Sequence, residues 1–147
     1  MLFIFVVIRT RFHAPKTEKI QGDFVPLTSR KKILIVEDDP DIRIMMGYIL
    51  KEDYDLVLCE DGRSGIAKAQ AEKPDLILLD IYMPGISGFE VCKTVRSSPE
   101  ICSTPIIILT AGALKEEVTE GYTLGADDYI FKPFDPEDLM ERIEKLL

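Results

Sequence analysis

Five short runs of apolar residues recur along the chain from residue 31 onward, with longer segments of mixed polarity between them. Because the apolar residues are continuous within each run and do not alternate, the pattern indicates strands covered on both faces. The intervening segments repeat apolar residues at helical spacing, as in Ile42, Met45, Met46, Ile49 and Leu50. The predicted strands lie within KKILIVE (31–37), YDLVLCE (54–60), PDLILLD (74–80), TPIIILT (104–110) and DDYIFK (127–132).

The end of the chain carries the clearest signal for the start of a helix. Asp135 and Pro136 are a typical N-cap and first-turn pair, and Leu139, Ile143 and Leu146 follow on one face. Strand and helix therefore alternate five times along the chain. Right-handed crossovers would arrange them as an α/β fold, a doubly wound five-stranded parallel sheet with helices on both sides.

Length and composition indicate one folded domain that follows an N-terminal extension. Of 147 residues, 46% are hydrophobic, which is enough for one sizeable core. The first eight residues, MLFIFVVI, are apolar but too few to span a bilayer, and they lack the features of a signal peptide. We interpret residues 1–30 as a poorly ordered extension and linker or the product of a misplaced start codon; a short anchor to a membrane surface or partner is the alternative. Residues 31–147 form the predicted domain.

Charge and cysteine content narrow the classes of function. Residues 1–30 hold five of the 18 Lys and Arg and two of the 26 Asp and Glu, so residues 31–147 carry 13 against 24, a net charge of −11. Such a surface repels a bare phosphate backbone and argues against direct nucleic-acid binding. Cys59, Cys92 and Cys102 fit neither a disulfide framework nor a C-x-x-C motif. We expect them to be reduced residues that fill the core of a cytoplasmic protein.

Polar residues stand where four of the five predicted strands end. Glu37 and Asp38 end the first strand, Asp80 ends the third, Thr110 ends the fourth, and Lys132 follows the fifth. The carboxyl ends of parallel strands share one edge of a doubly wound sheet, where ligands bind. Taken alone, Asp80 is explained as a turn residue, Thr110 as an ordinary strand residue and Lys132 as a surface lysine. Their convergence from four strands favours a functional site.

Other acidic residues near these strand ends have a sufficient structural interpretation. Asp39 precedes Pro40 and is predicted to be the N-cap of the first helix. Asp127 and Asp128 are interpreted as a solvated loop pair. We therefore assign no chemistry to these three residues.

The predicted group of carboxylates is best explained by a bound cation. Carboxylates that gather without a counter-charge are costly to ionise, and a cation removes that cost. One or two carboxylates, with waters and a phosphoryl group, form the octahedron that Mg²⁺ prefers. A carboxylate that attacks phosphorus also needs donors for the phosphoryl oxygens, a role that Lys132 and Thr110 would share with the metal.

Four motifs occur in order along the predicted domain, and their combination is specific. They are ILIVEDD (33–39), LILLDIYMPGISGFEVC (76–92), PIIILTA (105–111) and GADDYIFKPF (125–134). Together they resemble the receiver domain of two-component response regulators over essentially all of residues 31–147. The spacings agree as well, with 42 positions from Asp38 to Asp80, 30 from there to Thr110 and 22 more to Lys132. The resemblance implies the flavodoxin-like (βα)5 receiver fold.

The resemblance also implies which residues carry the chemistry. Asp80 would accept a phosphoryl group from a phosphohistidine on a sensor histidine kinase or phosphotransfer protein. Mg²⁺ would be held by Glu37, in part through water, by Asp38 and Asp80, and by the backbone carbonyl of Tyr82. Lys132 would pair with the acidic residues and then with a phosphoryl oxygen.

A conformational switch follows from the same resemblance. The Thr110 hydroxyl would move toward the phosphoryl group, and Tyr129 would rotate into the space that it leaves. The changed surface, made of the fourth helix, fifth strand and fifth helix (roughly residues 114–147), would meet a downstream protein or a second copy of the chain. The peptide bond from Lys132 to Pro133, usually cis in the family, would direct the lysine inward.

Two positions depart from what many receiver domains carry. Tyr82 and Gly112 stand where relatives often have polar side chains that orient a hydrolytic water. Gly112 offers no such group, and the Tyr82 ring would shield an acyl phosphate. These residues predict slow intrinsic dephosphorylation.

Other classes of function remain as alternatives. A phosphatase of the haloacid dehalogenase type also places an aspartate after an apolar strand, but it normally needs a second acid where Tyr82 stands here. A receiver-like interaction module would not need phosphate at all, although the intact acid, hydroxyl and lysine set argues against it. On the favoured interpretation, the protein is not an enzyme and catalyses only its own phosphorylation and slow dephosphorylation. The chain ends soon after the fifth predicted helix, so no output domain is expected within it, and a piece of a longer regulator would look the same.

Overall fold

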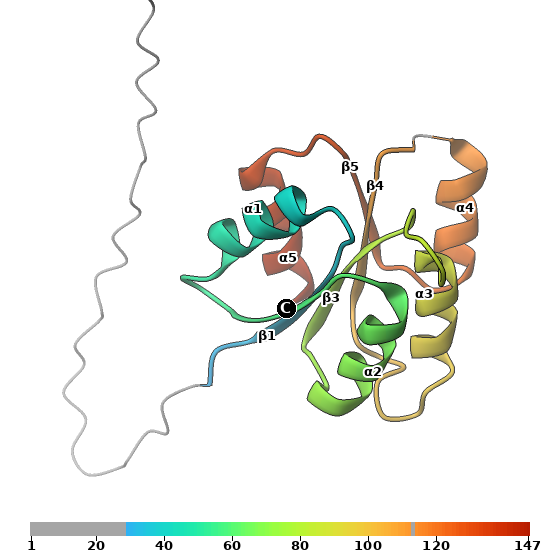
Figure 1. Ribbon diagram of the computed structural model, residues 1–147, viewed down its shortest axis with the longest axis horizontal. Coiled ribbons are helices and arrows are strands. Elements are labelled where there is room, and N and C mark those ends of the chain that lie inside the picture. Colours follow the sequence, from blue (N-terminus) through green and yellow to red (C-terminus); the bar gives the residue numbers. More distant parts are fainter. Residues whose placement is uncertain (1–28, 113) are drawn as a thin grey trace, which may run out of the picture.

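Five parallel strands form one sheet in the computed structural model, which describes residues 29–112 and 114–147 (Figure 1). The strand order is β2-β1-β3-β4-β5, and a helix follows each strand along the chain. The predicted doubly wound α/β sheet is therefore confirmed. The strands are β1 (Lys32–Val36), β2 (Asp55–Cys59), β3 (Leu76–Asp80), β4 (Ile106–Thr110) and β5 (Asp128–Phe131); the helices are α1 (Pro40–Leu50), α2 (Gly62–Glu72), α3 (Gly88–Arg96), α4 (Lys115–Thr123) and α5 (Pro136–Leu146).

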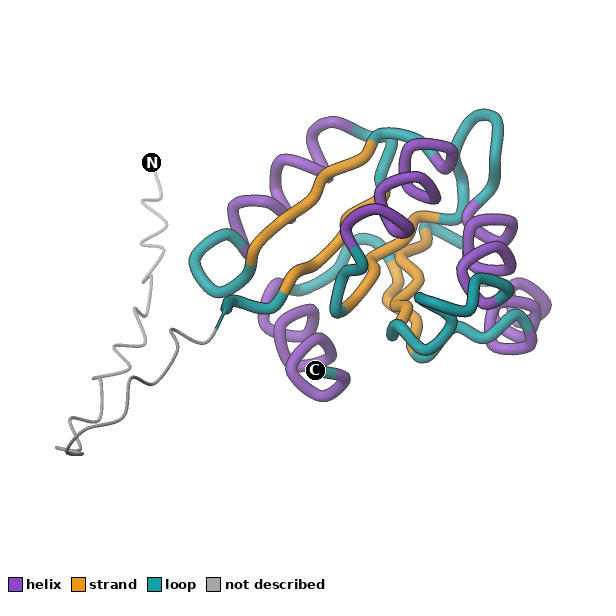
Figure 2. The backbone as a smooth tube through the Cα atoms, turned by 90° about the horizontal axis from the view of Figure 1, so that it is seen from below, coloured by secondary structure: helices purple, strands orange, loops and turns teal. Residues whose placement is uncertain are grey.

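Helices cover both faces of the sheet, which explains why the strand sequences are apolar without alternation. Helices α1 and α5 lie on one face and α2, α3 and α4 on the other (Figures 1 and 2). Ile33 and Ile35 of β1 pack in the core cluster with α1 and α5, whereas Leu34 and Val36 pack in the cluster on the opposite face. Neighbouring side chains of a strand point to opposite faces, so a strand buried on both sides needs apolar residues at every position.

Side-chain caps begin four of the five helices. Asp39 accepts hydrogen bonds from two backbone N–H groups in the first turn of α1, and Asp135 does the same for α5, so both predicted N-caps are confirmed. Ser87 and Glu90 form a capping box at the start of α3. Helix α4 differs, because its N-cap residue, Leu114, makes no side-chain cap hydrogen bond.

The interpretation of Asp127 and Asp128 as a solvated loop pair is incomplete for Asp127, which is exposed before β5, and wrong for Asp128, which is the first residue of β5. Asp127 accepts hydrogen bonds from the backbone N–H of Ile106 at 2.8 Å and from the Arg96 guanidinium at 2.9 Å. Arg142 of α5 donates to both carboxylate oxygens of Asp128 at 2.9 Å each. Strand β5 lies at the edge of the sheet and has only one neighbouring strand, so it lacks a second ladder of backbone hydrogen bonds. The bonds of the two aspartates hold this edge strand in place.

The three cysteines are free, and they differ in burial. Cys59 and Cys92 are buried, as expected of residues that fill the core. Cys102 is exposed in the turn that follows α3, so the expectation of a core residue is wrong there.

Most of the expected N-terminal extension, residues 1–28, lies outside the described residues. The described chain starts at Ser29, and β1 begins at Lys32. Among the described helices, none has both the length and the apolar content to span a membrane.

Gly88 brings the first turn of α3 against the backbone at the end of β3. Its N–H donates to the Ile81 carbonyl at 2.9 Å. A Cβ atom at this position would lie 2.7 Å from the Ile81 Cα and would overlap the carbonyl oxygen of Asp80. The backbone at the end of β3, where Asp80 lies, therefore depends on a residue without a side chain.

We expect Gly88→Ala to lower the free energy of unfolding by about 1–3 kcal/mol, because the clash is with backbone that cannot give way cheaply. Gly47→Ala in α1 is the matched control, since a Cβ there meets nothing within 4 Å, and it should raise stability by about 0.5–1 kcal/mol. Urea unfolding followed by circular dichroism measures both. Equal stabilities of the Gly88→Ala variant and the parent chain would contradict the proposed backbone contact.

Candidate functional site

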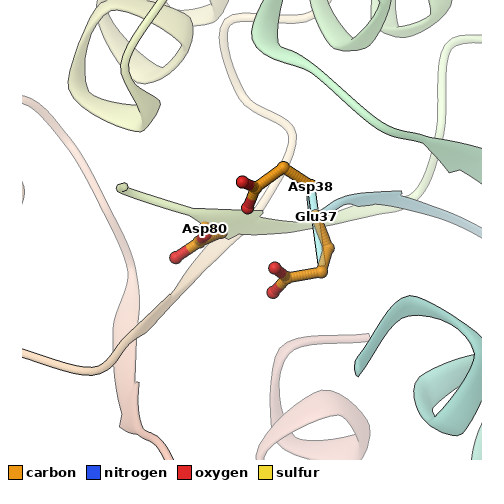
Figure 3. A group of neighbouring side chains, drawn as sticks. All are labelled: Glu37, Asp38 and Asp80. Atoms are coloured by element: carbon orange, nitrogen blue, oxygen red, sulfur yellow. The ribbon is translucent and has the colours of Figure 1, made fainter. Parts of the chain in front are cut away.

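Three carboxylates meet where the strand order of the sheet reverses. Strand β1 lies between β2 and β3, and ligands of doubly wound sheets bind at the carboxyl ends of strands at such a point. Glu37 and Asp38 follow β1, and Asp80 is the last residue of β3. One oxygen from each carboxylate lies within 4.8 Å of the other two, and the three side chains point to the same side of the strand ends (Figure 3). The sequence analysis expected these three carboxylates to gather at this edge of the sheet.

Two of the three carboxylates are removed from water. The exposed fraction is 0% for Glu37 and 3% for Asp80, while Asp38 is partly exposed. Lys132 places its Nζ 2.6 Å from Glu37 Oε2 and 3.4 Å from Asp80 Oδ1. The other oxygen of Glu37, Oε1, accepts the backbone N–H of Asp39 at 3.1 Å. Within the described residues, every ion pair of the cluster is made by Lys132, so negative charge remains in excess.

Burial and this excess of negative charge together raise the pKa of Asp80. Burial raises its pKa, the Glu37 carboxylate and more weakly that of Asp38 act in the same direction, and the Lys132 ammonium group opposes them, which leaves a pKa of about 6. A carboxylate held at this pKa gains from any cation that enters the pocket.

The donor set of the pocket fits a hard divalent cation. Three carboxylates from two adjacent strand ends supply only oxygen atoms, and Mg²⁺ prefers oxygen ligands while keeping several of its waters. Asp38 is partly exposed and leaves a side open to solvent. The described residues of this cluster therefore suit Mg²⁺ better than a softer metal, which would call for sulfur or imidazole ligands.

Arg43 supports this pocket, and the sequence reasoning missed it. Its Nη1 donates to the backbone carbonyls of Glu37 at 2.6 Å and of Asp38 at 3.2 Å, so α1 holds the loop that carries both acids. A basic residue in the first turn of a helix is electrostatically unfavourable. This unfavourable position could have indicated from the sequence that Arg43 bonds a group outside its own helix.

Lys132 reaches the pocket from the end of β5, and Thr110 ends β4, the strand beside β3. Thr110 is fully buried at the end of β4, and its hydroxyl accepts the backbone N–H of Gly112 at 3.0 Å. The backbone N–H of Lys132 donates to the Thr110 carbonyl at 2.8 Å. The peptide bond from Lys132 to Pro133 is cis, as the resemblance implied.

Tyr129 lies between β5 and α4, and it is almost fully buried. Its hydroxyl donates to the backbone carbonyl of Glu117 at 2.9 Å. A Cβ on Gly121 of α4 would lie 2.6 Å from the ring, so the ring occupies this place because Gly121 has no side chain. Burial, with smaller effects from neighbouring groups, raises the pKa of Tyr129 to about 12, so the hydroxyl stays a donor at neutral pH.

Comparison with known proteins identifies the family. The model of the response regulator receiver domain matches residues 33–144. The chain belongs to this family. The receiver domain is similar to the alkaline phosphatase synthesis transcriptional regulatory protein PhoP of Bacillus subtilis, with 41% identity over 118 residues, which are 80% of this chain and 48% of that protein. It is similar to the DNA-binding response regulator MtrA of Mycobacterium tuberculosis, with 37% identity over 82% of this chain and 52% of that protein. The chain thus spans about half the length of the curated relatives it matches.

Solved receiver domains share the fold. The chemotaxis protein CheY4 of Vibrio cholerae superposes with a TM-score of 0.78 at 37% identity, covering 81% of this chain and all of that one. The receiver domain of sensor histidine kinase PA1611 from Pseudomonas aeruginosa superposes with a TM-score of 0.75 at 28% identity, covering 80% and 98%. That structure has a magnesium ion coordinated in its active-site cleft. The flavodoxin-like (βα)5 fold implied by the sequence motifs is confirmed.

The raised pKa of Asp80 predicts a stability that depends on pH in the metal-free receiver domain. Because the folded pKa of about 6 exceeds the ordinary value of 3.8, folding favours the protonated acid. This contribution to stability is fully present below pH 3.8 and is lost as the pH rises through 6. Ionised Asp80 therefore costs the folded state at most about 3 kcal/mol at neutral pH.

We expect Asp80→Asn to be more stable than the parent by about 1–3 kcal/mol at pH 7.5, and by about 1 kcal/mol less than that at pH 5. Urea unfolding in the presence of a chelator at both pH values measures the difference. A variant that is less stable than the parent at pH 7.5 would show that Asp80 is not destabilised in the folded protein.

Proposed function

We propose that this receiver domain is a phosphorylation-switched signalling module that accepts a phosphoryl group on Asp80. The single observation that carries the proposal is the pocket itself, where Asp80 lies within reach of two more carboxylates and of the Lys132 ammonium group. A structural acid at a strand end has no need of this costly environment. Membership in the receiver family makes the phosphatase alternative unnecessary.

The phosphoryl donor would be a phosphohistidine on a sensor histidine kinase or phosphotransfer protein. A carboxylate oxygen of Asp80 attacks phosphorus, the bond from phosphorus to the histidine nitrogen breaks, and the imidazole takes up a proton. Lys132, already 3.4 Å from Asp80, turns from Glu37 toward a phosphoryl oxygen. The Thr110 hydroxyl gives up the Gly112 N–H and donates to another phosphoryl oxygen.

The proposed cofactor is Mg²⁺, held by Glu37 in part through water, by Asp38 and Asp80, and by the Tyr82 carbonyl. When bound, it offsets the repulsion between a carboxylate nucleophile and a charged phosphoryl group. The oxygen-only donor set supports this assignment, as does the magnesium ion in the cleft of the PA1611 receiver domain. Glu37 also anchors Lys132 until the phosphoryl group arrives.

The proposed switch carries the change at Asp80 to the surface formed by α4, β5 and α5. Movement of Thr110 toward the phosphoryl group alters the space beside Tyr129, whose hydroxyl is bonded to α4. A bias of about 1–3 kcal/mol between two conformations is enough for such signalling. The readout would be binding of a downstream protein or of a second copy of the chain.

The relatives named as DNA-binding or transcriptional regulators are longer than this chain, and the match covers about half of their length. We propose that the receiver domain itself does not bind nucleic acid. The net charge of −11 over residues 31–147 supports this proposal, because a phosphate backbone would be repelled.

The first test of the proposed function is intact mass spectrometry after incubation with acetyl phosphate. We expect one base-labile acyl phosphate that requires Mg²⁺ and is absent from Asp80→Asn. Asp39→Asn is the matched control, because Asn replaces Asp well as an N-cap and this residue lies outside the cluster. No adduct from acetyl phosphate or from a phosphorylated histidine kinase would contradict the proposal and favour a phosphate-independent interaction module.

A second test concerns the lifetime of the acyl phosphate. We expect Tyr82→Asn combined with Gly112→Glu to lose phosphate about tenfold faster than the parent, because the new polar side chains can orient a hydrolytic water. This rate increase is smaller than the one that a well-placed general base usually gives. A Cβ on Gly112 would lie 2.9 Å from the Tyr82 hydroxyl and would overlap Oε2 of Glu117, so removing the phenol makes room on one side and the flexible Glu117 side chain must move on the other. Loss is followed by mass spectrometry after the donor is removed; an unchanged rate would overturn the prediction of slow dephosphorylation.

A further inference from the structure

Tyr82 bridges the segments that follow β3 and β4, next to the strand end that carries Asp80. It follows Asp80 by two residues, yet its phenol lies against Gly112, two residues after Thr110 on the neighbouring strand. A Cβ on Gly112 would lie 2.9 Å from the Tyr82 hydroxyl and 3.3 Å from its ring. The side chain therefore spans the strip between the two strand ends that hold the reacting carboxylate and the buried hydroxyl.

A residue of α4 holds Tyr82 in this place. The Tyr82 hydroxyl donates a hydrogen bond to Oε1 of Glu117, in the first turn of α4. The other oxygen, Oε2, is buried beside Gly112 and has no hydrogen-bond partner among the described residues. Burying a carboxylate oxygen without a partner costs free energy. The hydrogen bond from Tyr82 to the other oxygen offsets part of that cost and holds the Glu117 side chain beside Gly112.

Glu117 receives the hydroxyls of two tyrosines. Its carboxylate accepts from Tyr82, and its backbone carbonyl accepts from Tyr129 at 2.9 Å. One residue of α4 is thereby bonded both to the loop after Asp80 and to the aromatic residue of the proposed switch. A displacement of α4 must change the hold on Tyr82, and a displacement of Tyr82 must change α4.

Access to Asp80 matters because this residue must meet both a phosphoryl donor and water. The exposed fraction of Asp80 is 3%, whereas that of Tyr82 is 50%. A half-exposed side chain on a loop moves at lower cost than the strands beneath it. Tyr82 is thus a side chain near Asp80 whose position a hydrogen bond can fix or release.

We propose that Glu117 is a positioning residue that holds Tyr82 across the mouth of the Asp80 site and so limits the entry of small phosphodonors and of water. This inference rests on the proposed function, since it concerns the rates at which the same site gains and loses phosphate. A cover acts on passage in both directions. Breaking the Tyr82–Glu117 bond therefore raises the rate of phosphate uptake and the rate of phosphate loss together, whereas a group that acts on water alone would change only the loss.

The test compares Tyr82→Phe, Glu117→Ala and Glu117→Gln in the full chain. Glu116→Ala is the matched control, because it removes the same charge from the same turn of α4 and the side chain makes no hydrogen bond or ion pair among the described residues. Uptake from acetyl phosphate with Mg²⁺ and loss after donor removal are followed by mass spectrometry. Thermal unfolding and Mg²⁺ affinity of each variant show whether the fold and the metal site are intact.

We expect Tyr82→Phe and Glu117→Ala to raise both rate constants by about 3- to 10-fold, the effect of losing one hydrogen bond to a carboxylate. Glu117→Gln should stay within about twofold of the parent, since its amide oxygen still accepts the bond, and Glu116→Ala should match the parent. Rates of Tyr82→Phe and Glu117→Ala that equal those of Glu116→Ala overturn the inference.

Hydrogen exchange separates this inference from the proposed function. If the parent takes up no phosphate, the proposed function fails. The role of the hydrogen bond between Tyr82 and Glu117 is then judged from the hydrogen exchange of residues 81–88 and 114–118. We expect faster exchange in Glu117→Ala than in Glu116→Ala, because the bond joins these two segments. Equal exchange in both variants overturns the inference whatever the phosphorylation result.

Discussion

The receiver domain depends on repulsion between three carboxylates that its fold brings together and only partly neutralises. Parallel strands bring Glu37, Asp38 and Asp80 to one edge, and burial of two of them raises the cost of their charges. Lys132 reduces this cost through its contacts with Glu37 and Asp80 at 2.6 and 3.4 Å, without cancelling it. The pocket is therefore poised to gain free energy from a cation, and an added phosphoryl group finds an ammonium group that is already in place.

The scaffold beneath the pocket shows how the fold withstands that repulsion. Arg43 binds the carbonyls of the β1–α1 loop, and Gly88 lets α3 pack on the backbone of Asp80. Neither residue offsets the charge of a carboxylate side chain directly. Both fix the backbone from which the acids project, so that repulsion between the acids cannot be relieved by a shift of the loops. A site that is destabilised in isolation needs such rigid supports to persist.

The sequence predicted the fold and the central cluster because both follow from local pattern. Apolar runs mark buried strands, and the carboxyl ends of parallel strands meet at one edge, so residues at strand ends are neighbours without further information. Contacts set by tertiary packing were out of reach. Tyr82 and Glu117 are 35 positions apart, and the partners of Asp127 and Asp128 come from α3, β4 and α5. No period or motif encodes such pairs, which is why the bonding partners of these two acids were missed.

Helix α4 differs from its neighbours in a way that suits a movable element. The other four helices begin at a side-chain cap, which fixes their first turn, whereas Leu114 supplies none. Gly121 in its interior lowers helix stability by about 1 kcal/mol relative to Ala, yet it is required because the Tyr129 ring occupies the space of a side chain. The hydroxyls of Tyr82 and Tyr129 both reach α4 at Glu117. A helix with weak local supports and two such tethers takes its position from them, so a change at the loop after Asp80 shifts α4 at a lower cost than it would shift a capped helix.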